Sequence, residues 1–158
     1  FDILNASSLC LGLMLGGEDL CLDLNCVKTK ERHELLYARS RVVNAARALG
    51  KFAVDTPFID PSDEKGLEKD AQFAKNLGFD GKAAINPRQI ITVNNIFSPT
   101  AEEINHSIRV MDAKKIAVKK GLGVFSLDGK MVDLPIIKRA ENLLETAKKI
   151  GWKVGELS

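Results

Sequence analysis

Three short apolar runs stand out in the first 90 or so residues of the chain. They cover residues 10–15, 52–59 and 82–85, and each is followed by Gly, Pro, Asp or Asn. Runs of this length that stay apolar at successive positions are typical of strands buried on both faces of a sheet. We therefore expect three strands and a sheet covered on both sides.

Helical periodicity fills the stretches between these runs. Apolar residues recur every three or four positions in residues 31–49 and again in residues 66–77, and a glycine follows each stretch, Gly50 and Gly78. Strands separated by helices pair in parallel, because a parallel neighbour needs a crossover of about a dozen residues or more. The pattern therefore predicts an α/β fold.

The pattern changes after the third run. Thr100–Glu103 has the spacing of a capping box, which opens a long helix, and the Asp-Gly pair at 128–129 predicts a tight turn. A last helical pattern begins near Pro135. We expect β/α units in residues 1–120 and a C-terminal extension in residues 121–158.

Three strands are few for the parallel sheet of an α/β protein. If units of roughly 30 residues were repeated to eight strands, the chain would hold only the last units of a β/α barrel. A small open doubly wound sheet is the other architecture that the pattern allows.

Composition excludes some classes of partner. The chain has 158 residues, 45% hydrophobic and 28% charged, and its 23 basic and 21 acidic residues leave a net charge of +2. That charge is too small to gather nucleic acid or an anionic membrane surface. Because no apolar run reaches about 18 residues, we also expect no membrane span.

The three cysteines are crowded near the beginning of the sequence. Cys10, Cys21 and Cys26 are an odd number and lack the paired spacings and histidines of a zinc site. We expect reduced, mostly buried thiols in a cytoplasmic protein.

Acidic and amide side chains follow the predicted strands, where parallel α/β proteins carry their active sites. Glu18 and Asp19 follow the first run, Asp55 and Asp60 lie at the end of the second predicted strand, and Asn86 follows the third run. Such oxygen ligands suit Mg²⁺. The same residue types also cap helices and form turns without any ligand, and the pattern leaves both interpretations open.

Four other ionisable residues admit a structural explanation. Lys82 is either a buried functional lysine or a residue at the rim whose stem covers apolar surface, and the pattern favours the rim. His33 and His106 lie in polar helical stretches, so we expect them at the surface. Asp133 stands where it would cap the last helix.

Six motifs, in order along nearly the whole chain, resemble the HpcH/HpaI aldolase family of acyl-thioester lyases, which includes the citrate lyase beta subunit. They are LMLGGEDL, ELLYARSRVVNAARALG, AVDTPFID, LGFDGKAAINPRQI, FSPTAEEI and GVFSLDGKMVDLPIIKRA. The resemblance implies a TIM (β/α)8 barrel, of which this chain would hold the sixth to eighth units and the C-terminal extension. The first five strands would lie outside it, with the family's substrate-binding Arg and one metal-binding Glu.

The resemblance also implies roles for individual residues. Asp19 matches a Mg²⁺ ligand, which makes Glu18 the less functional neighbour. Asp133 matches an acidic residue that reaches the active site of an adjacent subunit and handles protons there. Five residues are implied to border the substrate, its carboxylate or its thioester arm: Gly16, Gly17, Ile85, Asn86 and Pro87.

The implied reaction is a Mg²⁺-dependent retro-Claisen cleavage. A citryl thioester on acyl carrier protein would give oxaloacetate and an acetyl thioester; a malyl- or citramalyl-coenzyme A lyase is the related alternative. The family also implies a homo-oligomer, a trimer or hexamer, that works with other citrate lyase subunits. A different class is a truncated, non-catalytic interaction module, because part of a barrel is expected to be inactive alone and leaves strand edges unpaired.

Overall fold

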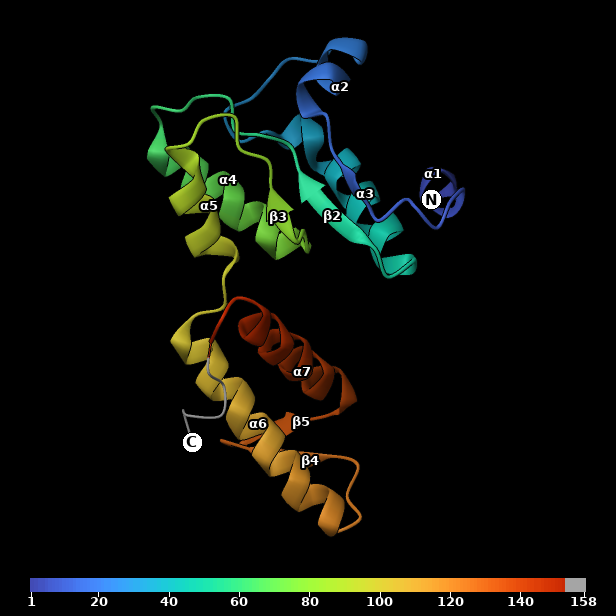
Figure 1. Cartoon of the computed structure of the whole chain (residues 1–158), viewed down its shortest axis with the longest axis vertical. Coiled ribbons are helices and arrows are strands. Elements are labelled where there is room, and N and C mark those ends of the chain that lie inside the picture. The colour runs from blue at the N-terminus through green and yellow to red at the C-terminus, as the bar shows by residue number, and fades with distance from the viewer. Residues whose placement is uncertain (153–158) are drawn as a thin grey trace. The chain divides into compact units, whose positions relative to one another are not determined.

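The computed structural model describes residues 1–152, which belong to two compact units. The first unit is Phe1–Phe97, and the second begins at Ser98 (Figure 1). The division comes earlier than the expected one after residue 120, because helix α6 (Ala101–Lys119) packs against helix α7 (Leu134–Lys149) of the second unit.

A parallel sheet forms the centre of the first unit. Strands β1 (Gly12–Met14), β2 (Phe52–Asp55) and β3 (Gly81–Lys82) lie in the order β1-β2-β3. This confirms the predicted α/β class. The strands are shorter than the apolar runs, and Pro57, which has no N–H to donate to a ladder, follows β2 closely.

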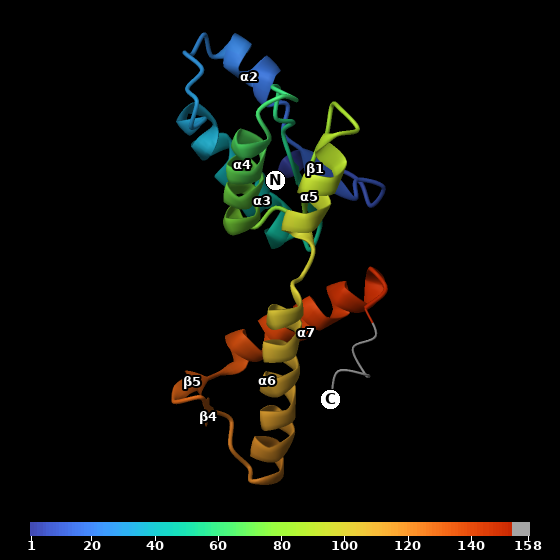
Figure 2. The same cartoon turned by 90° about the vertical axis from the view of Figure 1, so that its left-hand side faces the viewer.

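Five helices and one 3-10 turn surround or extend this sheet. They are α1 (Asp2–Asn5), α2 (Gly17–Asp23), the turn His33–Leu35, α3 (Leu36–Ala48), α4 (Glu64–Leu77) and α5 (Gln89–Phe97). Helices α4 and α5 lie side by side (Figure 2). The pattern predicted α3 and α4 but not α2 or α5. Helix α2 begins at glycine, a poor helix former, and α5 is rich in β-branched residues that favour strands.

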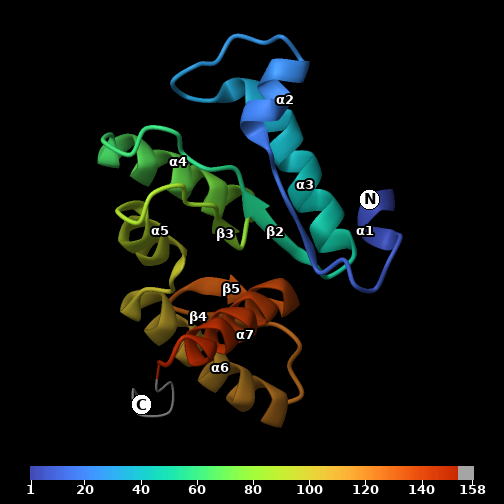
Figure 3. The ribbon, with the colours of Figure 1, turned by 45° about the horizontal axis from the view of Figure 1, so that its top comes forward.

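Only one face of the sheet is covered within the first unit. Ala53 of β2 is fully buried against Val43 and Ala46 of α3 and Ala74 of α4, and Figure 3 shows α3 running along β1 and β2. On the strand positions that face away, Met14 and Phe52 are each 63% exposed. The expectation that both faces are covered is therefore wrong for this unit, because none of its helices packs over those side chains.

The second unit joins a helix pair to a β-hairpin. Strands β4 (Phe125–Leu127) and β5 (Lys130–Val132) are antiparallel, and both residues of the turn between them have positive φ, 53° at Asp128 and 75° at Gly129. Both predictions for this region are confirmed, the Asp-Gly turn and the capping box at Thr100. Across residues 1–152, no helix is both long and apolar enough to cross a bilayer.

Candidate functional site

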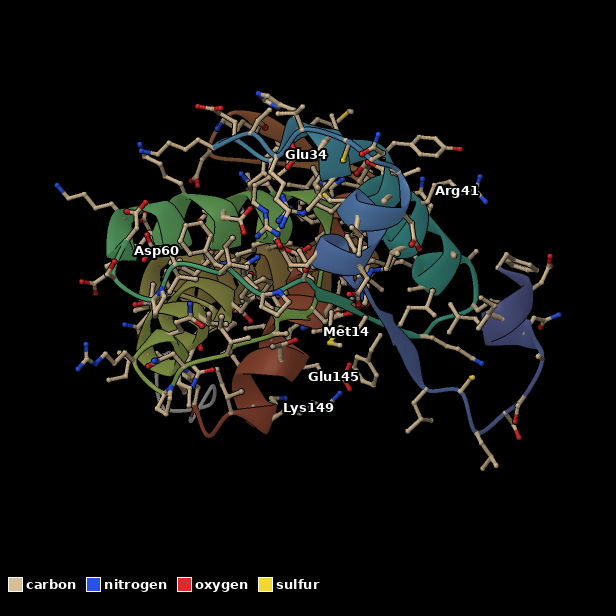
Figure 4. The ribbon with its side chains drawn as sticks, turned by 90° about the horizontal axis from the view of Figure 1, so that it is seen from above. Met14, Glu34, Arg41, Asp60, Glu145 and Lys149 are labelled. Carbon is tan, nitrogen blue, oxygen red and sulfur yellow. The ribbon has the colours of Figure 1, made fainter. Side chains whose placement is uncertain are left out.

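The carboxyl ends of the three parallel strands meet at one edge of the first unit. We call this edge the strand-end rim; it comprises residues 15–19, 55–60 and 83–89. Figure 4 looks down on it, with Asp60 on the segment that follows β2. All the predicted site residues except Asp133 lie on this rim or in the first turn of α2.

The glycine pair forms a close contact between two strand ends. The Gly17 N–H donates to Thr56 Oγ1 at 3.0 Å, in a buried position. A Cβ added to Gly17 would lie only 2.8 Å from Thr56 Oγ1 and 3.0 Å from Leu35 Cδ1. Glycine is therefore required here by close approach rather than by a special backbone angle.

Asp19 and Glu18 have different surroundings. Asp19 is exposed in the first turn of α2, and within residues 1–152 its carboxylate accepts no hydrogen bond and pairs with no cation. Glu18 forms ion pairs with Lys28 and, at 3.6 Å, with Arg32. Of the two neighbouring acids, Glu18 is therefore engaged by cations and Asp19 is not; the role of Asp19 as a metal ligand stays a prediction.

The other acids of the rim do not gather around Asp19. Within the described residues, no group of three or more His, Cys, Asp or Glu side chains is placed to hold a metal ion. Asp60 accepts hydrogen bonds from the hydroxyl and the N–H of Ser62, which hold its pKa below the ordinary range. Asp55 is fully buried. The turn explanation therefore applies to Asp60, and Asp19 is the rim carboxylate that neither a cation nor a hydrogen-bond donor of the described residues engages.

A buried group of charges lies beneath the rim, on the helix-covered face of the sheet. We call it the ion cluster; its members are Arg32, Arg39, Asp55, Asp70 and Lys82. Arg39 donates to Asp55 at 2.9 and 3.0 Å and to Asp70 at 2.7 Å. Lys82 Nζ lies 2.7 Å from Asp55 and 2.5 Å from Asp70. The cluster therefore joins β2 and β3 to α3 and α4.

The favoured expectation for Lys82, a residue at the rim with a solvated head, is wrong. Its side chain is fully buried, and its ammonium also donates to the Thr56 carbonyl at 2.7 Å. Lys82 stands directly opposite Asp55 in the parallel register, on the same face of the sheet. This pairing keeps the ammonium inside the protein, because its charge and hydrogen bonds are satisfied there.

Cations outnumber carboxylates in the ion cluster. Burial raises the pKa of Asp70, but Lys82 and Arg39 outweigh burial and hold that pKa below its ordinary value. Burial likewise lowers the pKa of Arg39, while Asp55 and Asp70 raise it overall. The excess of donors agrees with the two buried guanidinium nitrogens, Arg32 Nη2 and Arg39 Nη1, that have no hydrogen-bond partner in the described structure.

Sequence reasoning missed Arg39 and Asp70, although a signal was present. Arg39 lies on the buried face of α3, four residues after the buried N-cap Leu35 and four before Val43, and Asp70 interrupts the buried face of α4 between Leu67 and Ala71. Two charges of opposite sign on the apolar faces of successive helices indicate a buried pair.

The segment after β3 is tied to the segment after β2. Gln89 is buried; its side-chain oxygen accepts from the N–H groups of Ile85 and Asn86, and its Nε2 donates to the Phe58 carbonyl at 2.8 Å. The Ile85 side chain itself is 58% exposed. The predicted thioester border, Ile85 to Pro87, therefore lies at the rim and is held by a residue that the pattern did not single out.

A cavity of about 340 Å³ opens beside the rim. Its walls come from Glu18 and Cys21 of α2, from Arg32, and from Phe58 and Asp60 after β2, together with neighbouring residues. Charged side chains, Glu18, Arg32 and Asp60 among them, line it together with the apolar Phe58.

The remaining candidates lie elsewhere or take part in packing. His33 and His106 are exposed, as predicted. The three cysteines are free thiols; Cys21 is buried, and burial raises the pKa of its thiol. Asp133 is half-buried in the second unit and caps α7, its Oδ1 accepting from the Ile136 N–H at 3.3 Å. Its implied role in proton transfer stays a prediction.

Residues 2–87, more than half of the chain, match the model of the HpcH/HpaI aldolase/citrate lyase family. The chain belongs to this family. Among curated proteins it is 44% identical over 150 residues to the citrate lyase subunit beta of Escherichia coli K12, covering 95% of this chain and 50% of that protein. It is 38% identical over 146 residues to the mitochondrial citramalyl-CoA lyase of Mus musculus, covering 92% and 43%.

Solved structures of the HpcH/HpaI family agree with the fold. A crystal structure of protein CitE from Mycobacterium tuberculosis, in complex with magnesium, acetoacetate and coenzyme A, aligns with a TM-score of 0.74 at 32% identity. The alignment covers 87% of this chain and 52% of that one. The chain spans about half the length of the curated relatives it matches.

The family match extends over most of the rim and all of the ion cluster. Gly16, Gly17, Asp19 and residues 85–87 all lie within residues 2–87. Asp133 lies outside the matched range, although the similarity to the E. coli subunit covers 95% of the chain. The predicted family is thereby confirmed.

Proposed function

We propose that this chain forms the last three β/α units and the C-terminal extension of a carbon–carbon lyase, and that the strand-end rim is part of its active site. The observation that carries the proposal is Asp19, a carboxylate left free on a glycine turn at the carboxyl end of a parallel strand. Active sites of β/α barrels lie at this end of the strands.

The uncovered sheet face supports a barrel. Parallel sheets are normally buried on both sides, whereas Met14 and Phe52 are each 63% exposed on one side. Strands β1 and β3 are also the two edges of the sheet, and closure removes such edges. In a closed barrel these side chains would fill the interior.

The residues present fit Mg²⁺ with one carboxylate. Mg²⁺ commonly takes one or two protein carboxylates and completes its shell with water and substrate oxygens. Asp19 would hold it, while Glu18 and Asp55 are engaged by cations. When bound, Mg²⁺ supplies Lewis-acid polarisation of the oxygen that becomes the keto group.

The proposed substrate is a citryl thioester on acyl carrier protein. In the cleavage the hydroxyl loses its proton, the adjacent carbon–carbon bond breaks to give oxaloacetate, and the bonding pair stays on the acetyl thioester as an enolate that takes up a proton. Gly16, Gly17 and residues 85–87 would border the substrate. We assign the protonating role to Asp133, reaching the site of a neighbouring subunit in a homo-oligomer that works with other citrate lyase subunits.

The test replaces Asp19 in the complete expressed polypeptide. Asp19→Asn should abolish Mg²⁺-dependent cleavage and weaken Mg²⁺ binding in calorimetry, because it removes the charge and keeps the shape. Asp23→Asn, at an exposed site on the same helix, is the matched control and should leave both unchanged. Unchanged Mg²⁺ affinity in Asp19→Asn would refute the ligand assignment.

A citramalyl-coenzyme A lyase is the second candidate, favoured by the 38% identity to the mouse relative. Citryl, malyl and citramalyl thioesters should be compared on acyl carrier protein and on coenzyme A. The acyl group and the carrier that together give the highest kcat/KM identify the enzyme. Cleavage of none of them would favour a non-catalytic interaction module.

A further inference from the structure

Helix α2, which carries Asp19, has no capping side chain of its own. Its N-cap residue is Gly16, and no side chain at that position accepts from the first turn. The first N–H groups of a helix have no partner inside the helix and need one from elsewhere. The hydroxyl of Thr56, 39 residues away at the end of β2, accepts from Gly17 in this way.

Thr56 is itself held in place from the opposite side. The side chain is fully buried, and its backbone carbonyl accepts from Lys82 Nζ at 2.7 Å. Lys82 is anchored by Asp55 and Asp70. A chain of contacts therefore runs from the ion cluster through the carbonyl and the hydroxyl of Thr56 to Gly17, two residues before Asp19.

The contacts leave little freedom for the turn. Both Thr56 Oγ1 and Thr56 Cγ2 would lie within 3.0 Å of a Cβ at Gly17, so the threonine side chain forms one wall of the turn. On the other side of the turn, a Cβ at Gly16 would lie 3.5 Å from Asp19 Oδ2. The Asp19 carboxylate therefore lies over the turn that Thr56 holds.

We propose that Thr56 is a positioning residue for the metal ligand: its hydroxyl fixes the Gly16–Gly17 turn, and Lys82 fixes Thr56. The proposal rests on the proposed function as far as Asp19 binds Mg²⁺. That Thr56 holds the Gly16–Gly17 turn does not depend on whether Asp19 binds Mg²⁺. Groups that orient a ligand without touching the metal typically change metal affinity by about 10–100-fold when they are removed.

The experiment compares three substitutions in the complete expressed polypeptide. Thr56→Val keeps the shape and removes the hydroxyl, Thr56→Ser restores a hydroxyl, and Thr92→Val is the control at another buried threonine, in α5. Two properties are measured: amide hydrogen exchange in peptides covering residues 15–22 and residues 64–77, and the Mg²⁺ concentration that gives half-maximal cleavage.

Thr56→Val should speed exchange in residues 15–22 while α4, residues 64–77, exchanges as in the wild type. It should also raise the half-maximal Mg²⁺ concentration about tenfold or more, with a smaller change in kcat at saturating Mg²⁺. Thr56→Ser should restore both, and Thr92→Val should alter neither.

Three results would overturn the proposal. These are unchanged exchange in residues 15–22 of Thr56→Val, equal acceleration in α4, which indicates a general loss of stability, and an unchanged Mg²⁺ requirement. If the wild type shows no Mg²⁺-dependent cleavage, the proposed function fails instead, and the exchange measurement alone decides whether Thr56 holds the turn.

Discussion

Replacing Lys82 by methionine removes a cation from three oxygen atoms at once. Its ammonium contacts Asp55 and Asp70 at 2.7 and 2.5 Å and the Thr56 carbonyl at 2.7 Å, all buried. Each carboxylate keeps Arg39 as a second partner. The change therefore weakens the cluster without leaving a carboxylate alone.

The magnitude follows from these contacts. Hydrogen bonds to charged groups contribute about 1.5–3 kcal/mol each, so three give roughly 4–9 kcal/mol. These values are already net of the cost of taking the groups out of water, but Arg39 remains beside both carboxylates, so the loss should be smaller than this sum. We expect a loss of about 3 kcal/mol in the free energy of unfolding, near the lower end for breaking a buried pair.

The assay is urea denaturation of the complete expressed polypeptide, followed by circular dichroism. Lys69→Met, at an exposed lysine of α4, is the control and should stay within about 0.5 kcal/mol of the wild type. Adding Asp55→Asn to Lys82→Met should cost less than the sum of the single changes, since the two residues touch. A loss below about 1 kcal/mol for Lys82→Met, or full additivity, would refute the role given to this ion pair.

Three further changes test other parts of the molecule. Gly17→Ala should destabilise the protein by about 1–3 kcal/mol, because its methyl group would meet Thr56 Oγ1 at 2.8 Å; an unchanged urea midpoint would contradict this. The lowered pKa of Asp70 adds stability above the ordinary aspartate value of about 3.9, which is lost as the pH falls through the folded-state value. Asp70→Asn should therefore flatten the acid side of the stability profile below about pH 5, and an unaltered slope would count against the ion cluster as its source. Asp133→Ala should cost about 1 kcal/mol by removing the α7 cap, whereas Asp133→Asn keeps the cap; normal turnover in Asp133→Asn would eliminate its proposed proton transfer.

Some features of the fold could be predicted because their partners are close in sequence. The Thr100 capping box spans four residues, the Asp-Gly turn joins adjacent strands, and Asp133 accepts from a residue three positions later. Local rules suffice for such contacts. The alternation of strands and helices likewise predicted the α/β class.

Other features were predicted wrongly or missed because opposing preferences were decided by packing. The pattern favoured Lys82 at the rim with a solvated head, but packing between Asp55 and Asp70 buries it. Residues 89–97 form a helix despite their β-branched composition, because tertiary packing against α4 outweighs a weak local propensity.

The sequence by itself determined the fold class, the local caps and turns, and the family, and it identified Asp19 as the acid to consider. Only the tertiary structure decided that Lys82 is buried, that Asp55 belongs to an ion cluster and that Thr56 supports the glycine turn. The reason is distance along the chain. Arg39 and Asp55 are 16 residues apart, Asp55 and Lys82 are 27 apart, and Gly17 and Thr56 are 39 apart, so no local pattern records these contacts. They form only when the parallel strands bring their carboxyl ends together.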